Sequence, residues 1–323
     1  MRQVRMDEYG GPEVLHLVEG PDPRPGVGQV VVRTEAAGIT FVETQVRAGR
    51  PPWPGPGPAL PAVLGNGVEG EIVVVGEGVD PGLLGRRMVT ATGGLGGYAD
   101  RVVVNAADPI PIPDELKLGE AVALLADGRT ALALARAAAI TAADRVLVTA
   151  AAGGVGSLLV QLARAAGAKR VVAAAGSERK LALARELGAD TAVDYSRDGW
   201  ADEVRAATGG IDVAFDGVGG QLGRDALGLV GPGGRFLPYG AVSGARTAAS
   251  DLLQSGGTLI AGHTIVRSPE DNRALVAQAL AEAAAGRLRP VIGQRFALSQ
   301  AAAAHAAIEA RATMGKTLLI PES

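Results

Sequence analysis

Hydrophobic and polar positions change their spacing along the chain at about residue 115. Before that point, short β-branched and apolar runs stand between Gly/Pro turns, a pattern typical of strands. After it, Ala/Leu-rich stretches with helical spacing separate short apolar runs. The first part is therefore expected to be β-rich, with strands over Val14–Val18, Val30–Thr34, Glu71–Val75, Arg87–Ala91 and Arg101–Val104.

The second part alternates strands and helices, which predicts an α/β fold with a parallel sheet covered on both faces. A C-terminal strand, Lys316–Ile320, follows two helical stretches and is expected to return to the N-terminal domain. The predicted division is 1–118 with 263–323, and 119–262. The expected strands are Val146–Thr149, Arg170–Ala175, Thr191–Asp194, Ile211–Phe215, Arg235–Tyr239 and Thr258–Ala261, and the helices include Glu178–Leu187, Asp202–Ala207, Glu270–Gly286 and Leu298–Ala310.

A glycine turn joins the first of these strands to a helix. The helix after the turn has apolar residues at Leu158, Leu159 and Leu162. Glycines let backbone N–H groups approach a pyrophosphate, and the helix N-terminus adds partial positive charge. The strict GxGxxG spacing is not met, and a tight turn of another α/β protein is the alternative. The predicted dinucleotide-binding residues here are Ala152, Gly153, Gly154, Val155 and Gly156.

Composition narrows the function classes. The net charge is −3 over 323 residues with no long run of either sign, which argues against nucleic acid or an anionic membrane as a partner. Glycines and Gln161 argue against a membrane helix in the uncharged stretch 146–163. The first residues have no apolar signal-peptide core, so we expect a cytoplasmic protein. The chain has no Cys and three scattered His, which excludes disulfides and argues against a metal site.

Stretches across nearly the whole chain resemble the zinc-independent medium-chain dehydrogenase/reductases, and most of all their quinone oxidoreductase (zeta-crystallin) group. The resemblance implies a GroES-like β-rich domain, a doubly wound Rossmann domain that binds NADPH, and a homodimer or homotetramer. The stretches are EAAGITFVETQVRAG (35–49), LGNGVEGEIVVVGEGV (64–79), LLADGRTALALA (124–135), VTAAAGGVGSLLVQLAR (148–164), FDGVGG (215–220), GGRFLPYGAVSG (233–244) and ARATMGKTLLIP (310–321).

The second strand of the nucleotide-binding part ends in Gly176 and Ser177, where an NAD-preferring site typically carries an acidic residue. Small residues leave room for a 2′-phosphate. In the quinone reductases a Lys, a Tyr and an Arg border this phosphate, and Lys180, Tyr195 and Arg311 match those positions. Glu178 is a counter-signal; we expect it to face solvent or to pair with Arg179.

The resemblance also places residues around the nicotinamide and the substrate. Thr40 and Gln45 are expected to face the substrate, although quinone reductases commonly carry Asn and Tyr there. No substitute for a Tyr proton donor is evident, so protonation by water is expected. The Pro/Gly-dense segment 51–61 is either a stiff surface loop or one that offers Trp53 to a flat substrate. The residues expected to border the nicotinamide are Thr130, Gly217, Val218, Gly240, Val242 and Ser243.

The leading hypothesis is an NADPH-dependent, metal-free reductase of quinones or enones. Without a Lewis acid, conjugated acceptors are favoured because they delocalise the incoming negative charge onto oxygen. An enoyl-thioester reductase or a tailoring reductase of natural-product synthesis is the runner-up. A non-catalytic NADPH-binding protein is the alternative from another class.

Overall fold

The computed structural model describes residues 1–245, 247, 257–260 and 268–322. The chain forms two compact units, one of Met1–Ala126 with Val276–Ser323 and one of Asp127–Leu275. The predicted boundary between residues 118 and 119 falls just before helix α2 (Glu120–Ala123), which belongs to the first unit. The other predicted boundary, between residues 262 and 263, lies outside the described residues.

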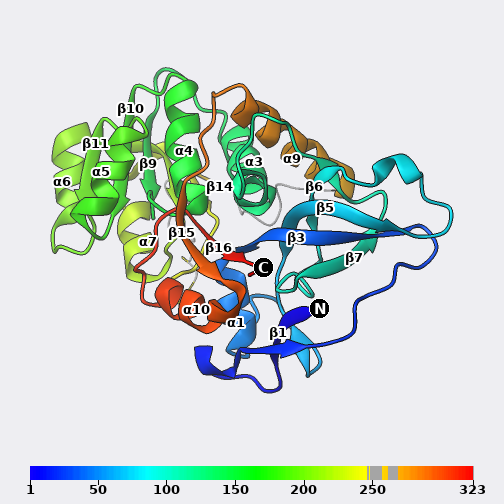
Figure 1. The fold of residues 1–323 in the computed structure, drawn as a ribbon. Coiled ribbons are helices and arrows are strands. Elements are labelled where there is room, and N and C mark those ends of the chain that lie inside the picture. The colour runs from blue at the N-terminus through cyan, green and yellow to red at the C-terminus, as the bar shows by residue number, and fades with distance from the viewer. Residues whose placement is uncertain (246, 248–256, 261–267, 323) are drawn as a thin grey trace. The chain divides into compact units, whose positions relative to one another are not determined.

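The first unit is built on a sheet with the order β15-β16-β3-β5-β6-β8, and β7 also pairs with β3 (Figure 1). The C-terminal strand β16 pairs antiparallel with β3, with Leu318 opposite Gly38. A smaller sheet has the order β2-β1-β4. The strands are β1 (Arg2–Met6), β2 (His16–Glu19), β3 (Gln29–Ile39), β4 (Ala62–Val63), β5 (Gly67–Val75), β6 (Arg87–Ala91), β7 (Arg101–Asn105), β8 (Ile110–Pro111), β15 (Ile292–Ala297) and β16 (Lys316–Ile320).

Short helices pack around these sheets. The core is aliphatic and includes Val30, Leu64, Ile72 and Leu319, all less than 1% exposed. The α-helices of this unit are α1 (Phe41–Arg47), α2 and α10 (Ala301–Glu309), and 3-10 helices cover Pro12–Val14, Pro81–Leu83 and Leu298–Gln300. Helix α9 (Pro269–Ala284) spans the division between the units.

Two sequence expectations for this unit are wrong in detail. The strand expected over Val14–Val18 begins only at His16, because Pro12 starts a 3-10 turn in which the Leu15 N–H donates to the Pro12 carbonyl at 3.2 Å. The helix expected over Leu298–Ala310 begins with a 3-10 turn and becomes α-helical only at Ala301.

The second unit holds a parallel sheet with the order β11-β10-β9-β12-β13-β14. The central strands are continuous apolar runs because both faces are buried; all residues of β10 after Arg170 are buried. The strands are β9 (Arg145–Thr149), β10 (Arg170–Ala175), β11 (Thr191–Asp194), β12 (Ile211–Asp216), β13 (Val230–Pro238) and β14 (Thr258–Leu259).

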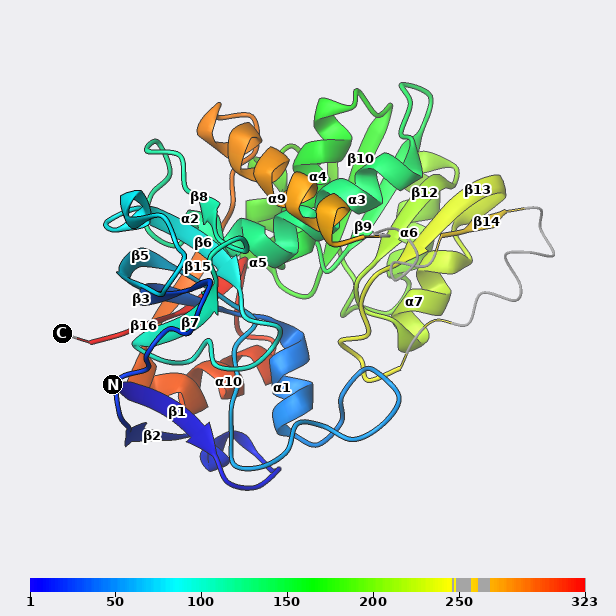
Figure 2. The same ribbon diagram turned by 90° about the vertical axis from the view of Figure 1, so that its right-hand side faces the viewer.

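Helices cover both faces of this sheet. The crossover from β9 through α4 to β10 and the crossover from β12 through α7 to β13 run in opposite directions along the sheet. Because both are right-handed, α4 and α7 lie on opposite faces (Figures 1 and 2). Phe236 and Trp200 belong to the apolar core beneath. The helices are α3 (Arg129–Ala138), α4 (Gly154–Ala165), α5 (Glu178–Glu186), α6 (Trp200–Thr208) and α7 (Gly220–Leu227), with a π-helical turn at Leu124–Gly128.

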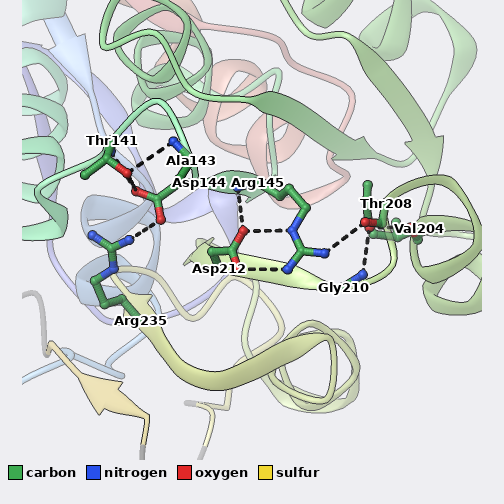
Figure 3. A network of polar contacts seen from close by, with 9 residues as sticks. All are labelled: Thr141, Ala143, Asp144, Arg145, Val204, Thr208, Gly210, Asp212 and Arg235. Atoms are coloured by element: carbon green, nitrogen blue, oxygen red, sulfur yellow. Dashed lines mark hydrogen bonds and ion pairs between the residues drawn. The ribbon is translucent and has the colours of Figure 1, made fainter.

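Two arginine–aspartate pairs link the start of β9 to β12 and β13 on the amino-terminal side of the sheet (Figure 3). Arg145 donates to both carboxylate oxygens of Asp212, each at 2.8 Å, and to the Thr208 carbonyl at 2.9 Å. Arg235 donates to Asp144, just before β9. The ion pairs lie at the amino-terminal ends of these strands, and the candidate site lies at their carboxyl ends.

Candidate functional site

The turn between β9 and α4 is so tight that Gly156 has no room for a side chain. A Cβ on Gly156 would lie 2.3 Å from the Ala150 carbonyl oxygen, and one on Gly154 would lie 2.0 Å from the side-chain atom Oδ2 of Asp127. The Gly153 N–H donates to the Ala150 carbonyl at 2.9 Å, with Ala150 itself in the left-handed region at φ 49. The first turn of α4 therefore lies directly against the end of β9.

The N-terminus of α4 has the backbone features of an anion site. Within the described residues no side-chain hydrogen bond caps this helix at Gly153, and its first turn carries no acidic residue, although the carboxylate of Asp127 lies close to Gly154. The first N–H groups of a helix have no partner inside the helix and carry partial positive charge. Such a twelve-residue helix after a glycine turn is suited to a phosphate group, and the binding role of residues 152–156 stays a prediction.

Gly176 directly follows β10 and lies against the ring of Tyr195. A Cβ on Gly176 would lie 3.2 Å from Tyr195 Cε2, and the Tyr195 N–H donates to the Ala175 carbonyl at 3.2 Å. Ser177 is the N-cap of α5, and the Lys180 N–H donates to its carbonyl at 3.0 Å. The structure thus brings Gly176, Ser177, Lys180 and Tyr195 to one strand end.

The counter-signal at this strand end is turned away. Glu178 has an exposed side chain that pairs with Arg185 at 2.5 Å. The expectation that Glu178 faces solvent is confirmed, and the alternative pairing with Arg179 is wrong. The cause is helical spacing: Arg185 lies two turns along α5, on the same face as Glu178.

Asp216 organises the loop after β12. Its carboxylate is fully buried and accepts the N–H groups of Val218 at 3.0 Å and Gly219 at 3.2 Å. It also accepts the hydroxyls of Thr149 at 2.9 Å and Thr247 at 2.8 Å. Sequence reasoning quoted this loop but did not single out Asp216; a carboxylate at a strand end before a glycine loop was the available signal.

The loops after β12 and β13 contact each other. A Cβ on Gly240 would lie 2.4 Å from the Gly217 carbonyl oxygen, and the Ser243 N–H donates to the Val218 carbonyl at 3.0 Å. The predicted residues Gly217, Val218, Gly240 and Ser243 therefore form one cluster. Val242 is half-buried in the same turn.

Thr130 lies elsewhere in the second unit. It is half-buried in the first turn of α3, beside Arg129. Asp127, which precedes that helix, is the residue whose carboxylate approaches Gly154. Asp127, three residues before Thr130, therefore brings the start of α3 close to the glycine turn.

In the first unit, Thr40 and Gln45 both belong to the segment of α1 but have different partners. Thr40 is the N-cap in a reciprocal capping box with Glu43, and Gln45 Nε2 donates to Thr44 Oγ1 at 3.2 Å. Glu43 is 3% exposed, and burial raises its pKa against the opposing effect of its bond to Thr40. Sequence reasoning missed Glu43, although the Thr-x-x-Glu spacing signals a capping box.

Arg311, also in the first unit, follows α10 in the left-handed region at φ 55. The Arg311 N–H donates to the Ile308 carbonyl at 2.9 Å and the Ala312 N–H to the Ala307 carbonyl at 3.0 Å. This is the Schellman arrangement, in which glycine usually occupies the left-handed position. The side chain of Arg311 is exposed.

The histidines do not form a metal site in the part of the chain that the structure describes, where no group of three His, Cys, Asp or Glu side chains is placed to hold an ion. His305 is buried, with its Nε2 3.0 Å from the Tyr98 hydroxyl, and burial lowers its pKa to about 3. His263 lies outside the described residues. Among the described helices, none is both long enough and apolar enough to cross a membrane.

Comparisons with known proteins cover nearly the whole chain. Residues 26–114 match the alcohol dehydrogenase GroES-like domain, and residues 154–282 match the zinc-binding dehydrogenase family. The quinone oxidoreductase of Pseudomonas aeruginosa is 34% identical, with 99% of each chain covered. The human quinone oxidoreductase is 32% identical over 99% of this chain and 98% of its own, and a 2-haloacrylate reductase of Burkholderia is 32% identical over 97% of both.

Solved structures give the same result. The Escherichia coli quinone oxidoreductase complexed with NADPH superposes with a TM-score of 0.89 at 29% identity, over 99% of this chain and all of the other. A mycobacterial protein complexed with NADPH gives a TM-score of 0.88 at 32% identity, over 99% and 100% of the two chains. The expected pairing of a GroES-like domain with a Rossmann domain is confirmed.

Proposed function

Because this chain belongs to the quinone oxidoreductase group of the medium-chain dehydrogenase/reductases, we propose that it transfers a hydride from NADPH to a quinone or to the activated C=C double bond of an enone. The observation that carries the proposal is the glycine turn at the start of α4 in the second unit, where no side-chain hydrogen bond caps Gly153 and the first turn of the helix has no acidic residue. Such a turn suits the pyrophosphate of a dinucleotide, whose nicotinamide would supply the hydride when bound. The relatives solved with NADPH support the choice of cofactor.

The preference for NADPH over NADH would come from the end of β10. Gly176 and Ser177 present no carboxylate to repel a 2′-phosphate, and Lys180, Tyr195 and Arg311 are the groups proposed to bind it. Charged hydrogen bonds contribute about 1.5–3 kcal/mol each and exposed ones less. Two cations and a hydroxyl would together give roughly 3–4 kcal/mol, or about two to three powers of ten in affinity.

The acceptor is proposed to be reduced without a metal. The chain has no cysteine, so it lacks the thiolate ligands that hold zinc in alcohol dehydrogenases of this superfamily. A conjugated acceptor needs less help, because the incoming charge spreads to its oxygen. Thr40 and Gln45 would face this acceptor. The nicotinamide would be bordered, and water excluded, by Thr130, Val242 and the cluster of Gly217–Val218 with Gly240–Ser243.

Domain roles and assembly complete the proposal. The first unit, predicted as 1–118 with 263–323, would bind the acceptor, and the second, predicted as 119–262, would bind NADPH. We propose a homodimer or homotetramer in the cytoplasm. The assembly is what the resemblance to the quinone oxidoreductase group implies.

One relative favours the C=C arm of the proposal. The 2-haloacrylate reductase of Burkholderia, named for a substrate with an activated double bond, is 32% identical over 97% of this chain. An enoyl-thioester or tailoring reductase would use the same arrangement on a larger substrate, and Thr40 and Gln45 leave that choice open.

The test is NADPH oxidation by the purified protein, followed at 340 nm with 1,4-benzoquinone, 1,2-naphthoquinone, 2-cyclohexenone and crotonyl-CoA. NADH in place of NADPH is the cofactor control. We expect turnover with the quinones or the enone and a strong preference for NADPH. Tight NADPH binding with no turnover on any acceptor would overturn the proposed activity and favour a binding protein.

A further inference from the structure

We propose that Glu43 supplies the proton of the reaction and that Thr40 delivers it to the oxygen of the reduced acceptor. The proposal rests on the proposed function, since an acceptor takes up a proton only when it is reduced. It replaces the expectation that water protonates the acceptor directly. Thr40 is the group that would touch the acceptor, and Glu43 acts through it.

The geometry joins the two side chains directly. Thr40 Oγ1 and the Thr40 N–H both donate to Glu43 Oε2, and the Asn66 N–H donates to Glu43 Oε1 at 2.8 Å. Glu43 is 3% exposed, whereas Thr40 is half-buried at the start of α1. The buried carboxyl group is thus joined to the hydroxyl of a half-buried residue.

The ionisation state of Glu43 decides what Thr40 offers. A hydroxyl has one hydrogen and two acceptor positions. Thr40 Oγ1 accepts the Glu43 N–H in the capping box, which fills one acceptor position. When Glu43 is a carboxylate, the Thr40 hydrogen points to it and the hydroxyl has only a lone pair left. When Glu43 is protonated, its O–H donates to the second lone pair, and the Thr40 hydrogen is available to an acceptor oxygen.

The surroundings of Glu43 keep a protonated form accessible. Burial raises its pKa, while the bond from Thr40 and the charge of Lys316 on β16 oppose the rise. Tyr98 also faces this carboxyl group, as a neutral phenol whose pKa burial raises, and the charge of Arg47 acts on Tyr98 in turn. A carboxylic acid held in this way is the kind of group that serves as a proton donor near neutral pH.

For an enone, NADPH would give up a hydride from C4 of its nicotinamide, where a C–H bond breaks and the cofactor is oxidised to NADP⁺. The hydride forms a C–H bond at the β-carbon of the enone, and the π electrons move onto the carbonyl oxygen. That oxygen takes the proton of Thr40 Oγ1, and Thr40 takes the proton of Glu43 Oε2 in the same step. Glu43 is left as a carboxylate and regains a proton from water. The enol then tautomerises to the saturated ketone.

The decisive variant is Glu43→Gln, measured with 2-cyclohexenone and NADPH between pH 5 and 9. In the wild type, kcat is expected to fall as pH rises through the pKa of Glu43, because the donor form is lost. In Glu43→Gln, kcat should drop about 100-fold and its alkaline decline should disappear, with KM for NADPH within about twofold. Glu43→Asp should restore the decline and part of kcat.

Glu69→Gln is the matched control. Glu69 is also a buried carboxylate of the first unit that accepts backbone N–H groups, from Gly119 and Val122, and burial raises its pKa as well. It lies on β5, whereas Glu43 and its partner Thr40 lie at the start of helix α1. This variant should lose stability but keep the pH profile of the wild type, which separates proton supply from structural damage.

Thr40 gives the second arm of the experiment. Thr40→Val should lose kcat as Glu43→Gln does, Thr40→Ser should retain most of it, and the double variant should be no slower than either single variant. A Glu43→Gln variant with the alkaline decline intact would overturn the proton relay alone. A wild type inactive on every quinone and enone would overturn the proposed function itself.

Discussion

Replacing Arg311 with glycine should make the protein slightly more stable and clearly less selective for NADPH. Arg311 sits in the left-handed region at φ 55, where its N–H closes the end of α10. That backbone conformation costs an L-residue about 1–2 kcal/mol. If the exposed side chain binds the 2′-phosphate, the attraction between its positive charge and the phosphate explains why arginine rather than glycine stands at this position.

The magnitude follows from three contributions. Glycine removes the backbone cost but loses about 0.5–1 kcal/mol through the freedom of its unfolded chain. A cation at a helix C-terminus contributes a few tenths of a kcal/mol, which glycine also forfeits. The net gain is about 0.5 kcal/mol, a rise of about 1–2 °C in Tm. Loss of one charged contact to the 2′-phosphate, about 1.4 kcal/mol, lowers the NADPH-over-NADH affinity ratio about tenfold.

The assay combines calorimetric melting with fluorescence titration of both nucleotides. Ala139→Gly is the matched control: Ala139 is also left-handed, at φ 46, exposed, and at the end of helix α3. It should gain stability to a similar or larger extent and keep the wild-type affinity ratio. An Arg311→Gly protein that selects NADPH as strongly as the wild type would refute the assignment of Arg311 to the phosphate.

Asp212→Asn should lower the free energy of unfolding by about 1–2 kcal/mol at pH 7. Because the hydrogen bond from Arg145 lowers the pKa of Asp212, the difference from wild type should persist above about pH 4 and vanish as pH falls through the folded pKa, as urea titrations would show. Gly156→Ala should lose about 3 kcal/mol or more and its nucleotide binding, since its Cβ would lie 2.3 Å from the Ala150 carbonyl; wild-type melting and titration would contradict this. Asp216→Asn should raise KM for NADPH about tenfold by displacing the loop it holds, and an unchanged KM in steady-state kinetics would show that the loop does not contact the cofactor.

Four strands were predicted with the bounds that the structure has: Arg87–Ala91 and Lys316–Ile320 in the first unit, and Arg170–Ala175 and Thr191–Asp194 in the second. Short apolar or β-branched runs bounded by turn residues show their ends in the sequence. β1 (Arg2–Met6) was missed because it is short and only half of its pattern is apolar. Helix α1 was missed because seven residues give too few turns for a period to emerge.

The residues of the candidate site also differ in whether their roles depend on local sequence or on distant contacts. The glycines of the α4 turn were predictable because their requirement is local: the chain must pass close to its own backbone. Asp216 was not, because its partner Thr149 lies 67 residues away in the sequence and meets it only through strand pairing. Glu43 is the intermediate case. Its capping-box spacing was visible, but its burial depends on the packing of the whole first unit.

The position of β16 has a consequence for how the protein is made. This strand lies between β15 and β3, yet it is the last to be synthesised. A ribosome that adds about 5–20 residues per second completes every strand of the second unit before residues 316–320 emerge. Until then β3 keeps part of one edge unpaired, so the nascent first unit stays incomplete, and a chain that lacked residues 316–320 would expose that edge to aggregation.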